Sequence, residues 1–157
     1  MVDAQSGHEK TLTGLLPALA GANLIYGLGM IESGMTFDHG QLVMDDEFAA
    51  MIKMCVGGIP VRDETLALDV IDEIGPFSDF LSHDHTRAHM REQSQPTLID
   101  RRVREEWKAA GSTTLYDRAL VKARQILETH VPDPLADGVA DELAVIVGAA
   151  ERELGVG

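Results

Sequence analysis

The sequence predicts a mostly α-helical protein with one or two β-strands, and three observations carry this prediction. Apolar residues recur at spacings of three and four along most of the chain, in segments that Gly and Pro bring to an end. Only the stretch Asn23–Gly34 is typical of a buried strand, and helical patterns at 5–22 and 41–56 flank it, which gives one step of a βα repeat. At 157 residues and 45% hydrophobic content, the chain is long enough for one domain with a core.

The predicted strand requires partners. A buried strand without neighbours leaves backbone N–H and C=O groups unpaired, at a cost of about 1–3 kcal/mol for each group. We therefore expect the chain either to be part of a larger protein or to complete itself by association.

The two helices that flank the strand have clear boundaries. The first begins near Gln5 and ends at Gly21, and Pro17 is expected to bend it because proline removes a backbone donor. The second follows a loop over 34–40 and is stopped by Gly57-Gly58. Its expected buried residues are Leu42, Val43, Phe48, Met51, Ile52 and Cys55.

A third helix follows, in which Asp63 is the expected N-cap and Gly75-Pro76 the stop. The composition changes at this Gly-Pro pair, from alternating apolar segments to a polar, histidine-bearing segment. We therefore divide the chain into residues 1–75 and residues 76–157.

The second part of the chain is predicted to be helical after its polar beginning. The polar segment covers 82–95, and helices are expected over about 98–110, 115–129 and 135–154. Trp107 and Tyr116 are expected to anchor the core. The last helix carries one apolar stripe, made of Val139, Leu143, Ile146, Val147, Ala150 and Leu154.

Composition excludes several classes of function. The formal charge is −13, and only Arg101, Arg102 and Arg104 cluster, which argues against a nucleic-acid binder. No apolar run approaches the roughly 20 residues that span a bilayer, and no secretory signal is recognisable at the N-terminus. A single cysteine, Cys55, excludes an internal disulfide, and its apolar neighbours predict a buried, inert thiol. We expect a cytoplasmic protein that binds neither nucleic acid nor membrane.

The glycines of the predicted strand do not form a dinucleotide-binding motif. That motif needs a third glycine where this chain has Glu32, and a helix should begin at once. If the strand belongs to a (β/α)8 barrel, its C-terminal end carries Glu32 to the face where barrel chemistry resides. Glu32 is then a polar ligand, and the alternative is a solvated loop carboxylate.

The histidines His83, His85 and His89 form the one metal-like cluster of the sequence. His85 and His89 are four residues apart and share a helix face, as zinc ligands do. However, Thr86 stands where a zinc protease motif has its glutamate, so we favour hydrogen-bonding histidines and predict no bound metal. No serine or cysteine lies in a nucleophile elbow, and the catalytic residues remain unknown.

The sequence also contains adjacent acidic residues on a predicted helix, and we do not interpret them as catalytic. Asp45 and Asp46 are interpreted as acids near a helix N-terminus that complement the helix dipole.

Several segments of the sequence, in order, resemble the C-terminal third of the trimethylamine methyltransferase family. In the first part they are Asp3–Lys10 (Asp-Ala-Gln-Ser-Gly-His-Glu-Lys), Gly21–Gly29 (Gly-Ala-Asn-Leu-Ile-Tyr-Gly-Leu-Gly) and Glu32-Ser33-Gly34. In the second part they are Asp63–Ala67, His85-Thr86, His89, and Asp100-Arg101 followed by Trp107. The resemblance covers nearly the whole chain.

The resemblance implies both a fold and an activity. Residues 1–75 would be the last βα units of a TIM barrel, and residues 76–157 a helical C-terminal extension. The enzyme would move a methyl group from a tertiary or quaternary amine, such as trimethylamine or glycine betaine, to the cobalt of a corrinoid on a partner protein. This chain would bind no cofactor directly, and Tyr26, Glu32 and Thr36 would lie on the substrate-binding face.

The same resemblance leaves the state of the chain open. Family members are much longer, and those that act on trimethylamine carry pyrrolysine, inserted at an amber codon, which we place at or just before the beginning of this chain. A reading frame that follows such a codon would be inactive by itself. The alternative is a non-catalytic helical module derived from such an enzyme, in which the predicted strand is covered in a homo-oligomer.

Overall fold

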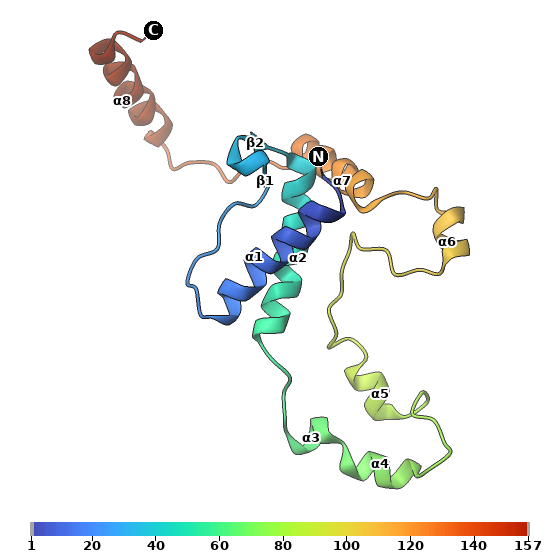
Figure 1. Ribbon diagram of the computed structural model, residues 1–157. Coiled ribbons are helices and arrows are strands. Elements are labelled where there is room, and N and C mark those ends of the chain that lie inside the picture. The colour runs from blue at the N-terminus through green and yellow to red at the C-terminus, as the bar shows by residue number, and fades with distance from the viewer. Residues whose placement is uncertain (1, 157) are drawn as a thin grey trace. The chain divides into compact units, whose positions relative to one another are not determined.

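The computed structural model describes residues 2–156, which are mostly helical with a small two-stranded sheet, as the sequence predicts (Figure 1). In chain order the elements are α1 (Ala4–Leu19), β1 (Met30–Ile31), the 3-10 turn η1 (Glu32–Gly34), β2 (Thr36–Phe37), α2 (His39–Val56), α3 (Asp63–Leu66), α4 (Leu68–Ile74), α5 (Asp84–His89), α6 (Arg104–Ala109), α7 (Leu115–Thr129) and α8 (Val139–Leu154).

The helices α1 and α2 pack against each other, and local caps define where they begin (Figure 1). The Asp3 side chain accepts hydrogen bonds from the first turn of α1, and Ser6 completes the capping box. Asp38 caps α2 by accepting from the backbone N–H of Gln41 at 2.6 Å. At the other end, Gly58 adopts φ +70° just after α2. The predicted boundaries of both helices are thus confirmed within about two residues.

The predicted buried strand over Asn23–Gly34 is wrong. Residues 23–28 form no strand, and the sheet consists of the antiparallel pairs Met30–Phe37 and Ile31–Thr36. The glycines of this stretch interrupt an extended conformation, because Gly27, Gly29 and Gly34 all have φ between +77° and +99°. Tyr26 is 83% exposed, so the backbone around it can bind water and the predicted cost of orphaned groups does not arise.

The region after α2 also differs from the prediction in its boundaries. The helix expected from Asp63 is interrupted at Ala67, which has φ +50°, and its N-cap is Arg62. The helix expected from residue 98 begins only at Arg104, because a carboxylate of α2 binds the preceding backbone N–H groups. By contrast, α7 has the predicted bounds.

The core formed by the described residues is small. Its buried hydrophobic side chains are Met44, Val70, Ala119 and Ala123. The other apolar residues expected to be buried on α2 are half-buried, and Cys55 is exposed, which contradicts the predicted buried thiol. The polar side chains of Gln41, Asp45 and Glu47 are more deeply buried than most apolar ones.

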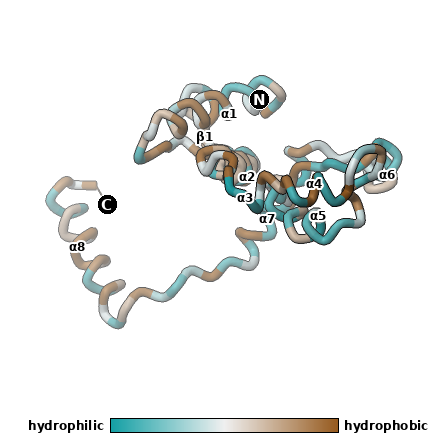
Figure 2. The backbone as a smooth tube through the Cα atoms, turned by 90° about the horizontal axis from the view of Figure 1, so that it is seen from below, coloured by the Kyte–Doolittle hydropathy of each residue, from teal (hydrophilic) through white to brown (hydrophobic). Residues whose placement is uncertain are grey.

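Contacts divide the described residues into two compact units, one up to Gln125 and one from Ile126 onward. In the second unit, α8 carries the predicted apolar stripe, which the hydropathy colouring of Figure 2 shows as brown segments alternating with teal, but none of its residues is buried. The sequence predicts a different division, into a barrel part over residues 1–75 and a helical extension over residues 76–157. That division stays a prediction.

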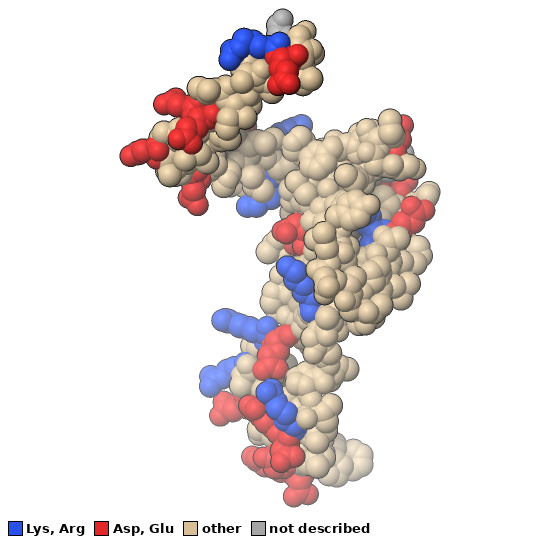
Figure 3. All heavy atoms as spheres, turned by 90° about the vertical axis from the view of Figure 1, so that its left-hand side faces the viewer, with Lys and Arg blue, Asp and Glu red and all other residues tan. Residues whose placement is uncertain are grey.

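Acidic and basic side chains are both visible on the surface of each unit (Figure 3). In α8, Asp141 and Glu142 of the first turn and Arg152 of the last turn carry charges that complement the helix dipole. Among the described residues, no helix is long and apolar enough to cross a membrane.

Candidate functional site

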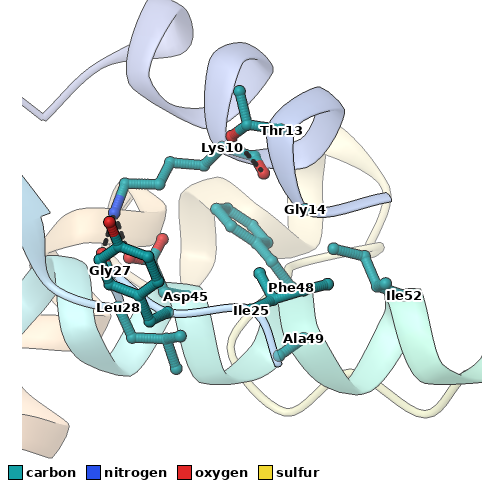
Figure 4. Close-up of a pocket in the computed structure, with 11 residues that line it drawn as sticks. Lys10, Thr13, Gly14, Ile25, Gly27, Leu28, Asp45, Phe48, Ala49 and Ile52 are labelled. Atoms are coloured by element: carbon teal, nitrogen blue, oxygen red, sulfur yellow. Dashed lines mark hydrogen bonds and ion pairs between the residues drawn. The ribbon is translucent and has the colours of Figure 1, made fainter. Parts of the chain in front are cut away.

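A buried carboxylate, Asp45 of α2, links this helix to α1 and to the segment before β1 (Figure 4). Its Oδ2 accepts from Lys10 Nζ of α1 at 2.7 Å and from the backbone N–H of Gly29 at 2.8 Å. Its Oδ1 accepts from Gln41 Nε2, one turn earlier on α2, at 2.6 Å. Lys10 Nζ also donates to the carbonyl of Gly27 at 2.8 Å. Both carboxylate oxygens are thereby satisfied, as a buried charge requires.

The turn held by this network depends on glycine. Gly29 is buried at φ +77°, and a Cβ atom there would approach the Phe37 ring to 2.8 Å and Leu42 Cβ to 3.1 Å. The backbone N–H of Asp38 donates to the Gly29 carbonyl at 2.8 Å, which continues the sheet beyond its two paired residues. The Gly27–Gly29 turn therefore depends both on the backbone conformation that Gly29 allows and on the hydrogen bond to the charged Asp45 side chain.

Two hollows flank the network. The first has a volume of about 150 Å³ and lies between α1, α2 and the segment before β1; its lining includes Lys10, Ile25, Tyr26, Asp45 and Phe48 (Figure 4). The second has a volume of about 480 Å³ and lies between α1 and the β1–η1 segment; its lining includes Glu9, Met30 and Glu32. Lys10 and Thr13 line both hollows.

The structure brings together two of the three predicted substrate-binding residues. Thr36 Oγ1 donates to Glu32 Oε2 at 2.5 Å, and Glu32 adopts φ +55°, a conformation that few non-glycine residues take. Tyr26 lines the other hollow, separated from Glu32 by the turn that Asp45 holds. The Glu32 carboxylate and the Thr36 hydroxyl thus lie together, whereas the exposed Tyr26 ring lies at the other hollow.

A second buried carboxylate, Glu47, holds the segment before α6. Its two oxygens accept from the backbone N–H groups of Thr97, Leu98 and Ile99 and from Thr97 Oγ1, at 2.7–3.0 Å. Burial by itself raises the pKa of Glu47, but these hydrogen bonds outweigh it and lower the pKa from its ordinary value. The same segment is also held by α7, because Arg118 Nε donates to the Leu98 carbonyl at 2.8 Å.

The histidine cluster is organised by hydrogen bonds. His83 Nδ1 accepts from the backbone N–H of His85 as the N-cap of α5, and His85 Nε2 lies 2.8 Å from the Glu64 carbonyl. His89 Nδ1 lies 2.7 Å from Glu92 Oε1, and the rings of His85 and His89 lie next to each other, with centroids 4.2 Å apart and planes tilted by 37°. In the part of the chain that the structure describes, no three His, Cys, Asp or Glu side chains could hold a metal ion. The absence of metal from the protein itself stays a prediction.

Comparison with known proteins places the chain in a family. A family model described as trimethylamine methyltransferase matches residues 1–155. The trimethylamine methyltransferase MttB of Desulfitobacterium hafniense (strain DSM 10664 / DCB-2) is 56% identical over 154 residues, which are 98% of this chain and 31% of that protein. The chain belongs to the trimethylamine methyltransferase family.

Other relatives of this family show the same coverage. MttB1 of Methanosarcina acetivorans is 44% identical over 150 residues, or 96% of this chain and 30% of the relative. A glycine betaine methyltransferase of D. hafniense (strain Y51) is 33% identical over 156 residues, or 98% of this chain and 32% of the relative. The chain thus spans about a third of the length of these methyltransferases, and the resemblance found in the sequence is confirmed.

Two central residues of this trimethylamine methyltransferase family member were missed by the sequence reasoning. Asp45 was interpreted as a helix-dipole acid, which is wrong because its carboxylate is buried and paired with Lys10. Glu47 was not considered. A signal for Asp45 did exist: Gln41, Asp45, Phe48 and Ile52 follow one another at spacings of four, three and four, so the carboxylate lies on the apolar face of α2.

Proposed function

We propose that this chain is part of a methyltransferase that moves a methyl group from a tertiary or quaternary amine, such as trimethylamine or glycine betaine, to a cobalt corrinoid on a partner protein. The match of residues 1–155 to the trimethylamine methyltransferase family is the observation that carries the proposal. Relatives named for both amines are similar to nearly the whole chain. Because the chain covers about a third of their length, the activity is proposed for the complete polypeptide.

The residues of this chain would bind and orient the amine. The Glu32 carboxylate, next to the Thr36 hydroxyl, is a suitable partner for a substituted ammonium group, and the Tyr26 ring could contact such a cation through its face. Holding the ammonium in one orientation directs one methyl group away from the binding residues. A bound corrinoid would supply a nucleophilic cobalt that accepts the methyl group, and the electron pair of the broken N–C bond would stay on nitrogen.

Tyr26 and Glu32 line different hollows, so they do not form an amine-binding site by themselves. We propose that other parts of the complete enzyme complete this site. Between α1 and α2 the chain forms the antiparallel pair β1–β2, which is not a parallel barrel strand, so the barrel assignment rests on the family resemblance alone. We propose that residues 1–75 are the last units of that barrel and residues 76–157 a helical extension. The chain by itself is then inactive, because part of a barrel has no closed sheet.

A second candidate function is a non-catalytic module that forms a homo-oligomer. Exposed apolar side chains favour it: Leu16 and Leu19 on α1 are 62% and 58% exposed, and Ile146 and Leu154 on α8 are 64% and 74% exposed. Faces of this kind are covered in stable proteins by another segment or another copy. The remainder of a methyltransferase would cover them equally well.

The size of the native polypeptide discriminates between the two candidates. An antibody raised against this 17.0 kDa chain is used to detect the protein in extracts of the source cells. The methyltransferase proposal predicts a band of roughly three times this mass, given that the chain is 31% of its relative. DNA sequence upstream of the chain should then contain barrel-like coding, with an in-frame amber codon if trimethylamine is the substrate. A native 17.0 kDa oligomer with noncoding DNA upstream would refute the proposal.

The activity is tested on the native polypeptide isolated with the same antibody. Trimethylamine and glycine betaine are supplied separately, with a reduced corrinoid protein as acceptor, and the change in the corrinoid absorbance is followed. We expect methylation with one of the two amines and none with the isolated 157-residue chain as the control. No methylation with either amine would contradict the proposed reaction.

A further inference from the structure

We propose that Lys10 and Asp45 are positioning residues, which hold the Gly27–Gly29 turn and thereby keep the segment that carries Tyr26 and Glu32 in one conformation for amine binding. The proposal rests on the proposed function and adds two residues to that site. Neither Lys10 nor Asp45 is offered as a contact to the amine.

The first argument is the geometry of the ion pair. Lys10 Nζ donates to the carbonyl of Gly27 at 2.8 Å, and Asp45 Oδ2 accepts from the N–H of Gly29 at 2.8 Å. Lys10 Nζ and Asp45 Oδ2 are themselves 2.7 Å apart. One ion pair therefore binds both ends of a three-residue turn, the carbonyl of its first residue and the N–H of its last.

The second argument is the burial of this pair. The side chain of Asp45 is 5% exposed and that of Lys10 is 24% exposed, so both charges are largely removed from water. Desolvation offsets most of the attraction in such a pair, and apolar residues of similar volume often stabilise a fold equally well. What an apolar pair could not provide is the set of directed hydrogen bonds to the Gly27 carbonyl and the Gly29 N–H. Fixing the backbone is thus the specific contribution of these two charges.

The third argument is the position of the turn in the chain. Tyr26 precedes it directly, and Glu32 follows it after β1, whose first residue, Met30, donates its N–H to the Gly27 carbonyl at 3.1 Å. The segment from Asn23 to Tyr26 is exposed, so few contacts besides the ion pair restrain it. A change in the turn therefore acts directly on the position of Tyr26 and, through β1, on that of Glu32, which Thr36 also holds.

The proposal is tested by amide hydrogen exchange, measured by NMR on the full 157-residue chain. Lys10→Met and Asp45→Asn remove the ion pair, and Lys10→Arg is the conservative variant that keeps a cationic donor. Two exposed residues of α2 give matched controls with the same chemical changes, Lys53→Met and Asp46→Asn. The two amides compared are those of Gly29, in the turn, and Ala49, in the middle of α2.

We expect Lys10→Met and Asp45→Asn to raise the exchange rate of Gly29 by about tenfold relative to that of Ala49, and the controls to change this ratio by less than about twofold. Lys10→Arg should restore most of the protection. A general loss of stability would accelerate both amides by the same factor, and that result, like an unchanged Gly29, overturns the proposal. Failure of both Lys10→Met and Asp45→Asn to fold overturns it as well.

This outcome is independent of the methyl-transfer assay. The exchange measurement involves no amine and no corrinoid, so the expected exchange result in the 157-residue chain, with no methylation by the native polypeptide, would contradict the proposed function alone. Equal acceleration of Gly29 and Ala49 in the variants of the 157-residue chain, together with methylation by the native polypeptide, would contradict the positioning role alone.

Discussion

Replacement of Glu47 by glutamine should weaken the attachment of the segment before α6 to α2. The carboxylate of Glu47 accepts from three consecutive backbone N–H groups and one hydroxyl, and only 8% of the residue is exposed. In Glu47→Gln the shape is kept, but an NH₂ group replaces one oxygen. At least one backbone N–H, that of Thr97 or of Ile99, then faces a donor.

The magnitude follows from the hydrogen bonds that change. One charge-assisted hydrogen bond contributes about 1.5–3 kcal/mol, and the remaining bonds to Glu47 become neutral and weaker. We expect Glu47→Gln to lower the free energy of unfolding by about 3 kcal/mol. Urea titration followed by the fluorescence of Trp107, the single tryptophan, measures it close to the segment concerned.

A matched control is available at the neighbouring position. Asp46 is exposed on α2, so Asp46→Asn removes one negative charge from the same turn without breaking a buried contact. We expect this variant to differ from the wild type by less than about 0.5 kcal/mol. If Glu47→Gln were no less stable than Asp46→Asn, the reasoning about the Glu47 carboxylate would be refuted.

Three further predictions follow from single residues. The pKa of Glu47 is lowered from its ordinary value of 4.5, so the contribution of this carboxylate to stability is present above pH 4.5 and is lost as the pH falls through the folded-state pKa. In urea titrations at acid pH, the difference in free energy of unfolding between wild type and Glu47→Gln should therefore become smaller. A difference that stays constant with pH would contradict this prediction. Gly29→Ala should lower the free energy of unfolding by about 2–4 kcal/mol, because Gly29 has a positive φ and an added Cβ atom would meet the Phe37 ring. Gly7, within α1, has open space around it, so Gly7→Ala should raise the free energy of unfolding by about 0.5–1 kcal/mol in the same urea titration. Cys55 should react with a thiol reagent at the rate of a free exposed thiol in the folded protein, and protection until urea is added would contradict its exposure.

Local sequence patterns determined where most helices lie. The bounds of α7 agree with the prediction, and α1 and α2 agree within about two residues, because caps such as Asp3 and terminating glycines act within one turn. Family membership was also readable from sequence, since the matching segments extend along nearly the whole chain. These features depend on residues close together in the sequence, or on the sequence itself.

Only the tertiary structure decided which polar groups are buried and what they hold. Asp45 meets Lys10 across 35 residues, and Glu47 meets Thr97 across 50 residues, so neither pairing has a local signature. The strand expected over Asn23–Gly34 failed for the same reason: strand formation depends on neighbours in space, and the glycine turns favour a short hairpin instead. Helix formation is settled within a few residues, whereas burial and pairing of charges are settled by the segments that the fold brings together.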